Sequence, residues 1–147
     1  MNIHIREAKL ADLEDVLRVY KDAGLETRGS LSIQTARGIF EKMTTYPSYR
    51  VHIAEVDGII CGTFALLIMD NLANGGIPSG IVEDVAVARS FQGQGVGKAM
   101  MRFAMEECKR NGCYKMTLSC NEMREQAHKF YESLGFARHG FSYRVGL

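Results

Sequence analysis

Apolar side chains recur along this chain at two spacings, and each spacing predicts a kind of element. In two early stretches they return every three or four residues: Leu13, Val16, Leu17 and Tyr20, then Ile33, Ala36, Phe40 and Met43. This spacing puts the side chains on one face of an amphipathic helix. Ser32 precedes the second stretch and is a candidate N-cap, because its hydroxyl can accept a hydrogen bond from the first turn. The pattern therefore predicts two helices in the first third of the chain.

Shorter apolar runs bounded by turn-forming residues predict strands. They are Ile3–Glu7, Arg50–Val56, Ile59–Met69, Ile81–Val87 and Tyr114–Cys120. Asp57-Gly58 is a hairpin turn signal between two of them, and Asp70–Gly80 is rich in the residues that form loops. A last pair of strands is expected near Phe136 and at Phe141–Val145.

The second half of the chain adds two helices to this pattern. A polar stripe with a broad apolar remainder predicts a helix from about Gly93 to Arg110, and a shorter helix is expected over Ala127–Leu134. Strands dominate the first half, and strands alternate with helices afterwards. This order predicts an α/β (α+β) fold in a single domain of residues 1–147, with helices on both faces of one sheet.

Composition narrows the classes of partner. A chain of 147 residues with a net charge of +1 gives no electrostatic reason to expect binding to nucleic acid or to an anionic membrane. The first residues contain no apolar signal segment, and Ile59–Met69, the longest apolar run, is too short to cross a bilayer. We therefore expect a cytoplasmic protein with no membrane partner.

No metal centre is expected either. The histidines are scattered, at His4, His52, His128 and His139. None has the spacing of metal ligands, and the position of His128 indicates the exposed side of a helix. The cysteines lie in apolar runs, at Cys61, Cys108, Cys113 and Cys120. They form no Cys-x-x-Cys pair and are expected to be buried free thiols in a reducing compartment.

The most specific chemistry lies in Gln92-Gly93-Gln94-Gly95-Val96-Gly97, between an expected strand and an expected helix. Glycines at alternate positions let the backbone approach a ligand, and the first turn of a helix offers unpaired amides and positive partial charge. Together these properties favour a phosphate or diphosphate. A P-loop is excluded because Ala99 has no hydroxyl for magnesium, and a dinucleotide fingerprint is excluded because Lys98 replaces its third glycine.

Two motifs carry a resemblance to a known family. Gln92, Gly95 and Gly97 satisfy the pattern Gln/Arg-x-x-Gly-x-Gly/Ala, and Ala127–Phe136 follows with the pattern Ala-x-x-Phe/Leu-Tyr-x-x-x-Gly-Phe. In order, spacing and residue type the chain resembles the GNAT superfamily of acyl-CoA-dependent N-acyltransferases. The resemblance implies a GNAT fold, a mixed and mostly antiparallel sheet whose two central parallel strands splay apart. It also implies acetyl-CoA as the cosubstrate.

The resemblance assigns roles to single residues as well. The implied cofactor-binding residues are Val85, Ala86, Val87, Gln92, Gly93, Gln94, Gly95, Val96, Gly97, Lys98, Asn121 and Tyr131. The loop amides would hold the CoA diphosphate, and the backbone of Val85–Val87 would pair with the pantetheine arm. Tyr131 is the implied catalytic acid that protonates the departing thiolate. The family often has asparagine where this chain has Arg124, so Asn121 is the nearest candidate for that contact.

Direct acetyl transfer also needs a base for the amine. Deprotonating an amine with a pKa of about 10.4 at pH 7 costs roughly 4–5 kcal/mol. Glu83 is the candidate catalytic base, with Asp84 and a chain of water as alternatives. Strict alternation along Ile81–Val87 puts Glu83 and Asp84 on opposite faces, so only one of them is expected to face a given cleft.

The predicted activity is N-acetylation of a primary amine of a small molecule by direct transfer. Ile81–Val87 with Gly112–Lys115 is similar to glucosamine-6-phosphate N-acetyltransferases, and Ala127–Arg144 is similar to aminoalkylphosphonate N-acetyltransferases. The acceptor is thus expected to include an amino-sugar phosphate or an aminoalkylphosphonate. A peptide or protein amine, and a non-catalytic acyl-CoA-binding regulatory domain, stay open as alternatives.

The acceptor groove is expected between the first two helices and the Asp70–Gly80 loop. Arg28, Arg37 and Arg50 are the candidate contacts for an anionic group of the acceptor. Enzymes of this kind are commonly dimers, so the resemblance implies a homodimer, with the last strands as its interface.

Overall fold

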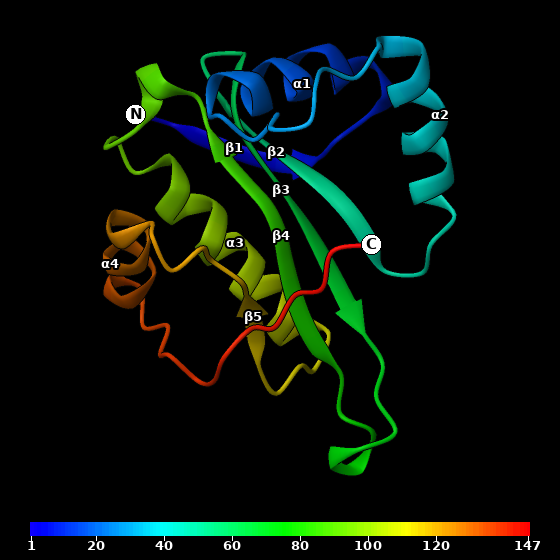
Figure 1. The fold of residues 1–147 in the computed structure, drawn as a ribbon, viewed down its shortest axis with the longest axis vertical. Helices are drawn as coiled ribbons and strands as arrows, with labels where there is room; N and C mark the ends of the chain where they lie inside the picture. Colours follow the sequence, from blue (N-terminus) through cyan, green and yellow to red (C-terminus); the bar gives the residue numbers. More distant parts are fainter. The chain divides into compact units, whose positions relative to one another are not determined.

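The structure is a computed structural model that describes every residue from Met1 to Leu147 (Figure 1). The chain forms two compact units, Met1–Thr117 and Leu118–Leu147. No α-helix of either unit combines the length and the apolar character that a membrane crossing requires.

The first unit is built on a mixed sheet with the strand order β1-β2-β3-β4-β5. Its strands are β1 (Ile3–Glu7), β2 (Tyr49–Val56), β3 (Ile59–Met69), β4 (Ser79–Val87) and β5 (Met116–Leu118). Each pair from β1 to β4 is antiparallel. The Gly80 N–H donates to the Lys115 carbonyl at 2.9 Å, and the Tyr114 N–H donates to the Pro78 carbonyl at 3.1 Å, so β4 and β5 start side by side and run the same way. The expected mixed, mostly antiparallel sheet is confirmed.

Helices cover both faces of this sheet, as expected. The helices are α1 (Leu13–Asp22), α2 (Ile33–Thr44) and α3 (Val96–Arg110), with short 3-10 turns at η1 (Leu10–Asp12), η2 (Asn74–Gly76) and η3 (Arg89–Phe91). On one face Val16 and Val19 of α1 share a core with Ile53 and Ala65 of the sheet. On the other face α3 packs so closely that a Cβ at Gly62 would lie 2.7 Å from the Met100 sulfur.

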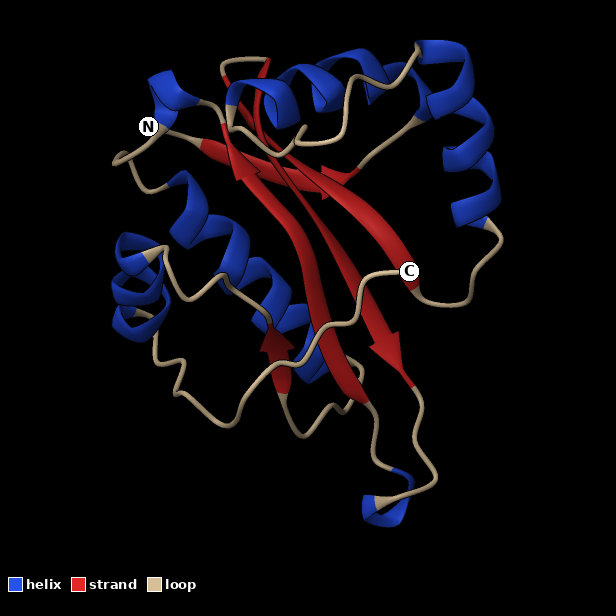
Figure 2. Ribbon diagram, viewed as in Figure 1, coloured by secondary structure: helices blue, strands red, loops and turns tan.

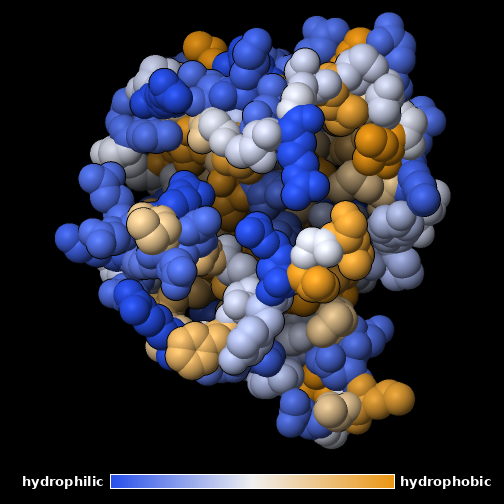
Figure 3. Space-filling view, viewed as in Figure 1, coloured by the Kyte–Doolittle hydropathy of each residue, from blue (hydrophilic) through white to orange (hydrophobic).

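The predicted boundaries of these elements hold with small shifts. β1 and β3 have the expected ends, and the Ser32 side chain caps α2 by accepting a hydrogen bond from the Thr35 amide at 3.2 Å. The Asp70–Gly80 region is a loop with η2 inside it, and it projects at the bottom of Figures 1 and 2. Figure 3 shows apolar atoms on this projecting tip, where Leu72 is fully exposed.

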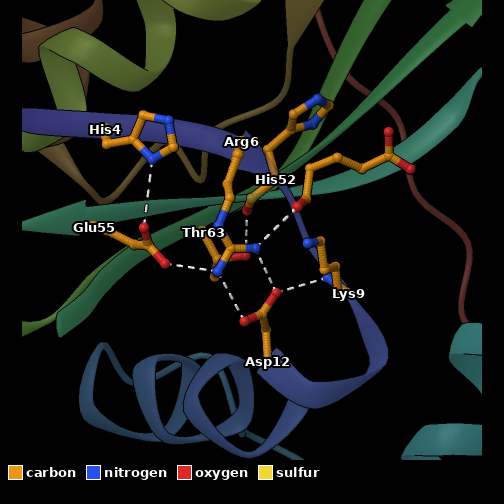
Figure 4. A network of polar contacts seen from close by, with 8 residues as sticks. His4, Arg6, Lys9, Asp12, His52, Glu55 and Thr63 are labelled. Carbon is orange, nitrogen blue, oxygen red and sulfur yellow. Dashed lines mark hydrogen bonds and ion pairs between the residues drawn. The ribbon is translucent and has the colours of Figure 1, made fainter. Parts of the chain in front are cut away.

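An ionic network ties the start of the chain to β2 (Figure 4). The Arg6 guanidinium donates to both carboxylate oxygens of Asp12, at 2.7 and 3.0 Å, and to Glu55 at 2.6 Å. The Lys9 amide also donates to Asp12, at 2.7 Å. Hydrogen bonds from Arg6 lower the pKa values of Asp12 and Glu55, and those bonds raise the pKa of Arg6. The network therefore braces β1, η1 and β2 by charge-assisted bonds.

The second unit contains one helix, α4 (Glu125–Ser133), and a long irregular tail. The prediction of two strands, near Phe136 and at Phe141–Val145, is wrong, because no strand follows β5 (Figure 2). A strand needs another strand to pair with, and this unit offers a helix. Phe141, Tyr143 and Val145 are 89%, 90% and 78% exposed, although their alternation is typical of a strand with one buried face.

Candidate active site

The glycine loop connects the end of β4 to the start of α3. Gly93 and Gly95 have φ values of 74° and 89°, in the left-handed region that residues with a Cβ avoid. Gly95 is the N-cap, so the helix begins at Val96 rather than at Gly93. A Cβ at Gly93 or Gly95 would meet no atom within 4 Å, so backbone conformation rather than crowding within the protein requires glycine at both.

Six consecutive amides of this loop have no hydrogen-bond acceptor in the protein. They run from Gly93 to Lys98, and the first intrahelical bond is donated by Ala99 to the Gly95 carbonyl at 3.0 Å. The positive end of the α3 dipole adds to their attraction for an anion. Lys98 is exposed in the first turn and brings a full positive charge. The arrangement is a preformed cradle for a phosphate or diphosphate.

Side chains on both sides of the loop hold it in this shape. The Gln92 side-chain amide donates to the Val87 carbonyl at 3.0 Å, and the Gln94 side-chain amide donates to the Ser90 carbonyl at 2.7 Å. Asp22, at the end of α1, accepts a 2.6 Å bond from the Arg89 amide. The two glutamines thus brace the backbone of the loop. Sequence reasoning missed Asp22, because nothing in the pattern linked the end of a helix to a loop 67 residues later.

A β-bulge interrupts β4 beside this loop. Glu83 lies opposite Ala65 and Ala86 lies opposite Thr63, so Phe64 faces two residues, Asp84 and Val85. Asp84 takes the extra position with a φ of 52°, a left-handed conformation that aspartate tolerates better than most residues. The prediction of strict alternation along Ile81–Val87 is therefore wrong at Asp84.

The bulge brings both carboxylates to the same face of the sheet. Glu83 is beside Ala65, which belongs to the core under α1, and Asp84 lines a cavity with Tyr20 of α1. Burial raises the pKa of Tyr49, and the nearby charges of Asp84 and Glu83 raise it further. Glu83 and Asp84 still line different cavities, so the expectation that only one of them faces a given cleft holds, although both lie on the same face of the sheet.

Two cavities open on this face, one at each carboxylate. The first, of about 430 Å³, is lined by Tyr46, Pro47, Tyr49, Leu67, Ile81 and Glu83. The second, of about 340 Å³, is lined by Leu17, Tyr20, Leu25, Glu26, Thr27, Arg28, Gly29, Leu31 and Asp84. The segment between α1 and α2 lines the second cavity, and residues of the Asp70–Gly80 loop line neither cavity.

Arg28 is the one predicted anion contact that lines either cavity. Arg50 makes other contacts: it donates to the carbonyl oxygens of Tyr46 and Tyr49 and forms an ion pair with Glu7 at 3.3 Å. Arg37 is exposed on α2.

Tyr131 lies in the second unit, on α4. Its ring packs between Phe130 and Phe136, with centroids 5.1 and 5.5 Å away. Burial raises the pKa of Tyr131, Cys120 raises it further, and Arg124 opposes the shift. The phenol is therefore a protonated donor at neutral pH, which is the state that a catalytic acid requires.

Comparison with known proteins identifies the family of this chain. The family model described as the acetyltransferase (GNAT) family matches residues 13–136 of this chain. The chain belongs to the GNAT acetyltransferase family. The resemblance carried by the two motifs is thereby confirmed, and so is the GNAT fold.

Three similar proteins illustrate the relationship. A glucosamine 6-phosphate N-acetyltransferase of Trypanosoma brucei brucei is 36% identical over 67% of this chain and 65% of its own length. An aminoalkylphosphonate N-acetyltransferase of Salmonella typhimurium is 26% identical over 96% of this chain and 91% of its own. The crystal structure of glucosamine-6-phosphate N-acetyltransferase from Arabidopsis thaliana has a TM-score of 0.86 at 25% identity, covering 99% of each chain.

Asn121 is engaged within the second unit of this GNAT protein. Its side-chain oxygen accepts a 2.9 Å bond from the Met123 amide, and its carbonyl accepts from Arg124 and contacts His128 at 2.8 Å. His128 is therefore half-buried rather than on the exposed side of α4 as predicted. The turn that Asn121 closes leads into α4 and so supports Tyr131.

The remaining candidate residues can be placed as well. All four cysteines are free, but Cys113 and Cys120 are half-buried rather than buried as expected. No three side chains of His, Cys, Asp or Glu gather as a metal site would require. The groups suited to catalysis or anion binding are therefore the amide cradle, two carboxylates and a phenol.

Proposed function

We propose that this GNAT protein transfers an acetyl group from acetyl-CoA directly to the primary amine of a small molecule. The observation that carries the proposal is the run of six unpaired amides from Gly93 to Lys98, directly after a strand whose bulge presents two carboxylates. A diphosphate fits the first feature, and an amine that must lose a proton fits the second. We also infer that the two units work together as one catalytic domain.

The binding of acetyl-CoA would use backbone more than side chains. The diphosphate would accept hydrogen bonds from the amides of Gly93–Lys98, with Lys98 near an outer phosphate. β5 is short and joins only the beginning of β4, so Val85, Ala86 and Val87 have no strand beside them on that edge. Pantetheine pairing there would add the missing neighbour, and an amide of this segment would polarise the thioester carbonyl. This edge is what supports the predicted splay of the two parallel strands.

Glu83 and Tyr131 would carry the two proton transfers. Glu83 takes the proton of the acceptor ammonium, directly or through water, and the free amine attacks the thioester carbonyl. The C–N bond forms, the C–S bond breaks, and Tyr131 gives its phenolic proton to the departing sulfur. The nitrogen then loses its second proton to water, and a proton from water restores the phenol. Asp84 is the alternative base, because the bulge puts it on the same face. The residues Gln92 and Asn121 would act by holding the loop and the turn in shape rather than by touching the reacting atoms.

The relatives set the first acceptors to assay. Their names include glucosamine 6-phosphate and aminoalkylphosphonate N-acetyltransferases, so an amino-sugar phosphate and an aminoalkylphosphonate head the panel of amines. Arg28 lines the same cavity as Asp84 and is the candidate contact for an anionic group of such an acceptor.

We further propose that the protein is a cytoplasmic homodimer. Four free thiols suit a reducing compartment. The exposed, alternating apolar side chains of Phe141, Tyr143 and Val145 would be covered by pairing with a second copy. Light scattering of the full chain and of a variant that carries Phe141→Ser and Tyr143→Ser tests this, since the dimer should weaken only in the variant.

The experiment that tests the proposed function follows free thiol release from acetyl-CoA in the presence of each amine. Glu83→Gln should lower kcat/KM most at neutral pH and less at high pH, because an amine that is already neutral needs no base. Asp84→Asn is the matched control. If only Asp84→Asn changes the pH profile, the base is Asp84 and the assignment to Glu83 is wrong.

A further inference from the structure

The cavity beside Glu83, called here the aromatic pocket, differs in chemistry from its neighbour. Its lining is Tyr46, Pro47, Tyr49, Leu67, Ile81 and Glu83. Five of these six side chains are apolar or aromatic, the single charge is negative, and no cation is among them. Such a lining suits a positively charged amine on an apolar skeleton and disfavours a phosphate, whose charge would be repelled by Glu83.

The aromatic wall of the pocket is held in place before any ligand arrives. The rings of Tyr46 and Tyr49 stack with centroids 6.4 Å apart and an angle of 15°. Between them Ser48 turns the chain with a φ of 53°. The Arg50 guanidinium donates to the carbonyl oxygens of Tyr46 and Tyr49, at 2.9 and 2.8 Å. A wall clamped in this way loses little conformational freedom when a ligand binds.

The position of the carboxylate completes the pocket. Glu83 precedes the bulge and is opposite Ala65, next to the buried core under α1. The negative charges of Asp84 and Glu83 add to burial in raising the pKa of Tyr49. An ammonium group in this cavity would have a carboxylate and the face or hydroxyl of a tyrosine among its lining groups.

We propose that the aromatic pocket is the acceptor-specificity site, which holds an aromatic or otherwise apolar skeleton with its amine at Glu83. The inference rests on the proposed function and narrows its acceptor to arylalkylamines and related apolar amines. Arg28 lies at the other cavity, together with Glu26 and Asp84, so that cavity also carries more negative than positive side chains. Neither cavity offers the paired cations that a phosphate dianion usually meets.

The test compares kcat/KM for four amines under one thiol-release assay: phenethylamine, ethylamine, 2-aminoethylphosphonate and glucosamine 6-phosphate. Burial of a ring against Tyr46, Tyr49 and Leu67 should raise kcat/KM for phenethylamine about 10- to 100-fold above that for ethylamine. The two phosphorus-containing amines should fall below phenethylamine as well. A preference for either of them would overturn the inference and leave the proposed function standing.

Variants of the aromatic wall, Tyr46 and Tyr49, provide a second test. Tyr49→Ala should raise KM for phenethylamine about tenfold or more, and by a larger factor than it raises KM for ethylamine, and Tyr49→Phe should restore the wild-type ratio. Tyr114→Ala is the matched control, because Tyr114 is 46% exposed, close to the 42% of Tyr46, and lines neither cavity.

The remaining outcomes are distinct. If Tyr46→Ala and Tyr49→Ala change the oligomeric state but not the choice of amine, the wall is an interface between copies and the inference is wrong. If no amine releases thiol and calorimetry detects no acetyl-CoA binding, the proposed function fails first. A loss of phenethylamine turnover in Tyr49→Ala that is absent in Tyr114→Ala, with acetyl-CoA affinity unchanged, supports the inference.

Discussion

The two units of the chain hold their functional groups in different ways. Every buried apolar residue belongs to Met1–Thr117, and no residue of Leu118–Leu147 is buried. The amide cradle follows a central strand and opens a helix whose Met100, Met101 and Ala104 are completely buried. Tyr131 depends on two neighbouring aromatic rings and a turn closed by Asn121. The anion site thus lies at the start of a helix with fully buried residues, whereas the proposed acid lies on a helix that has none.

The largest expected effect is on kcat, from a substitution in the second unit that leaves CoA binding in place. Tyr131→Phe should lower kcat about 100-fold, because the departing thiolate loses its proton donor, while the affinity for CoA stays within about twofold. Stopped-flow thiol release and calorimetry measure the two quantities. Tyr143→Phe is the control, since Tyr143 is 90% exposed. An unchanged kcat would remove Tyr131 from the mechanism.

A substitution in the amide cradle should do the reverse of Tyr131→Phe and weaken CoA binding. Gly95→Ala forces a side chain into a left-handed conformation at a cost of roughly 1–2 kcal/mol, and relaxation of the loop should weaken CoA binding about tenfold. Gly38→Ala, in the interior of α2, is the matched substitution and should stabilise the protein by about 0.5–1 kcal/mol. Equal effects of the two changes on CoA binding would contradict the role of the loop.

The ionic network tests how much of the rigidity of the first unit is electrostatic. Arg6→Gln should cost about 2 kcal/mol of unfolding free energy, because it leaves two partly buried carboxylates without their donor. Chemical denaturation measures the loss. Lys109→Gln, which breaks an exposed pair with Glu106, should change stability little.

The same network predicts a pH dependence. The pKa values of Asp12 and Glu55 are lower in the folded protein, so the stability that they contribute is present above about pH 4 and is lost as the pH falls further. Arg6→Gln should flatten this acid limb of the stability curve. A wild-type curve without any loss below pH 4 would contradict the assignment.

The smallest expected effect concerns His52, which is buried against Phe64 and Phe103 with an unpaired Nδ1. Burial lowers its pKa, so the unfolded chain binds the proton more readily, and stability should fall below about pH 6.5. His52→Phe should reduce that loss between pH 7 and 5. Thermal denaturation at both pH values decides, and an equal loss in the variant would contradict the prediction.

The sequence predicted features that depend on local pattern. The ends of β1 and β3, the Ser32 cap and the glycine loop follow from spacing and from glycine chemistry, and the structure agrees with each. The bulge at Asp84 was not predictable, because aspartate marks no left-handed position unless the opposing strand is known. The tail strands were predicted wrongly, since alternation shows which side chains need cover but not where a pairing edge exists.

The central claim is that unpaired amides, rather than a cluster of basic side chains, bind the diphosphate of CoA. Calorimetry with the wild-type chain should show CoA binding one to one, and pantetheine, which lacks the diphosphate, should bind at least about 100-fold more weakly. Equal affinities for the two compounds, or no heat with CoA, would contradict the account.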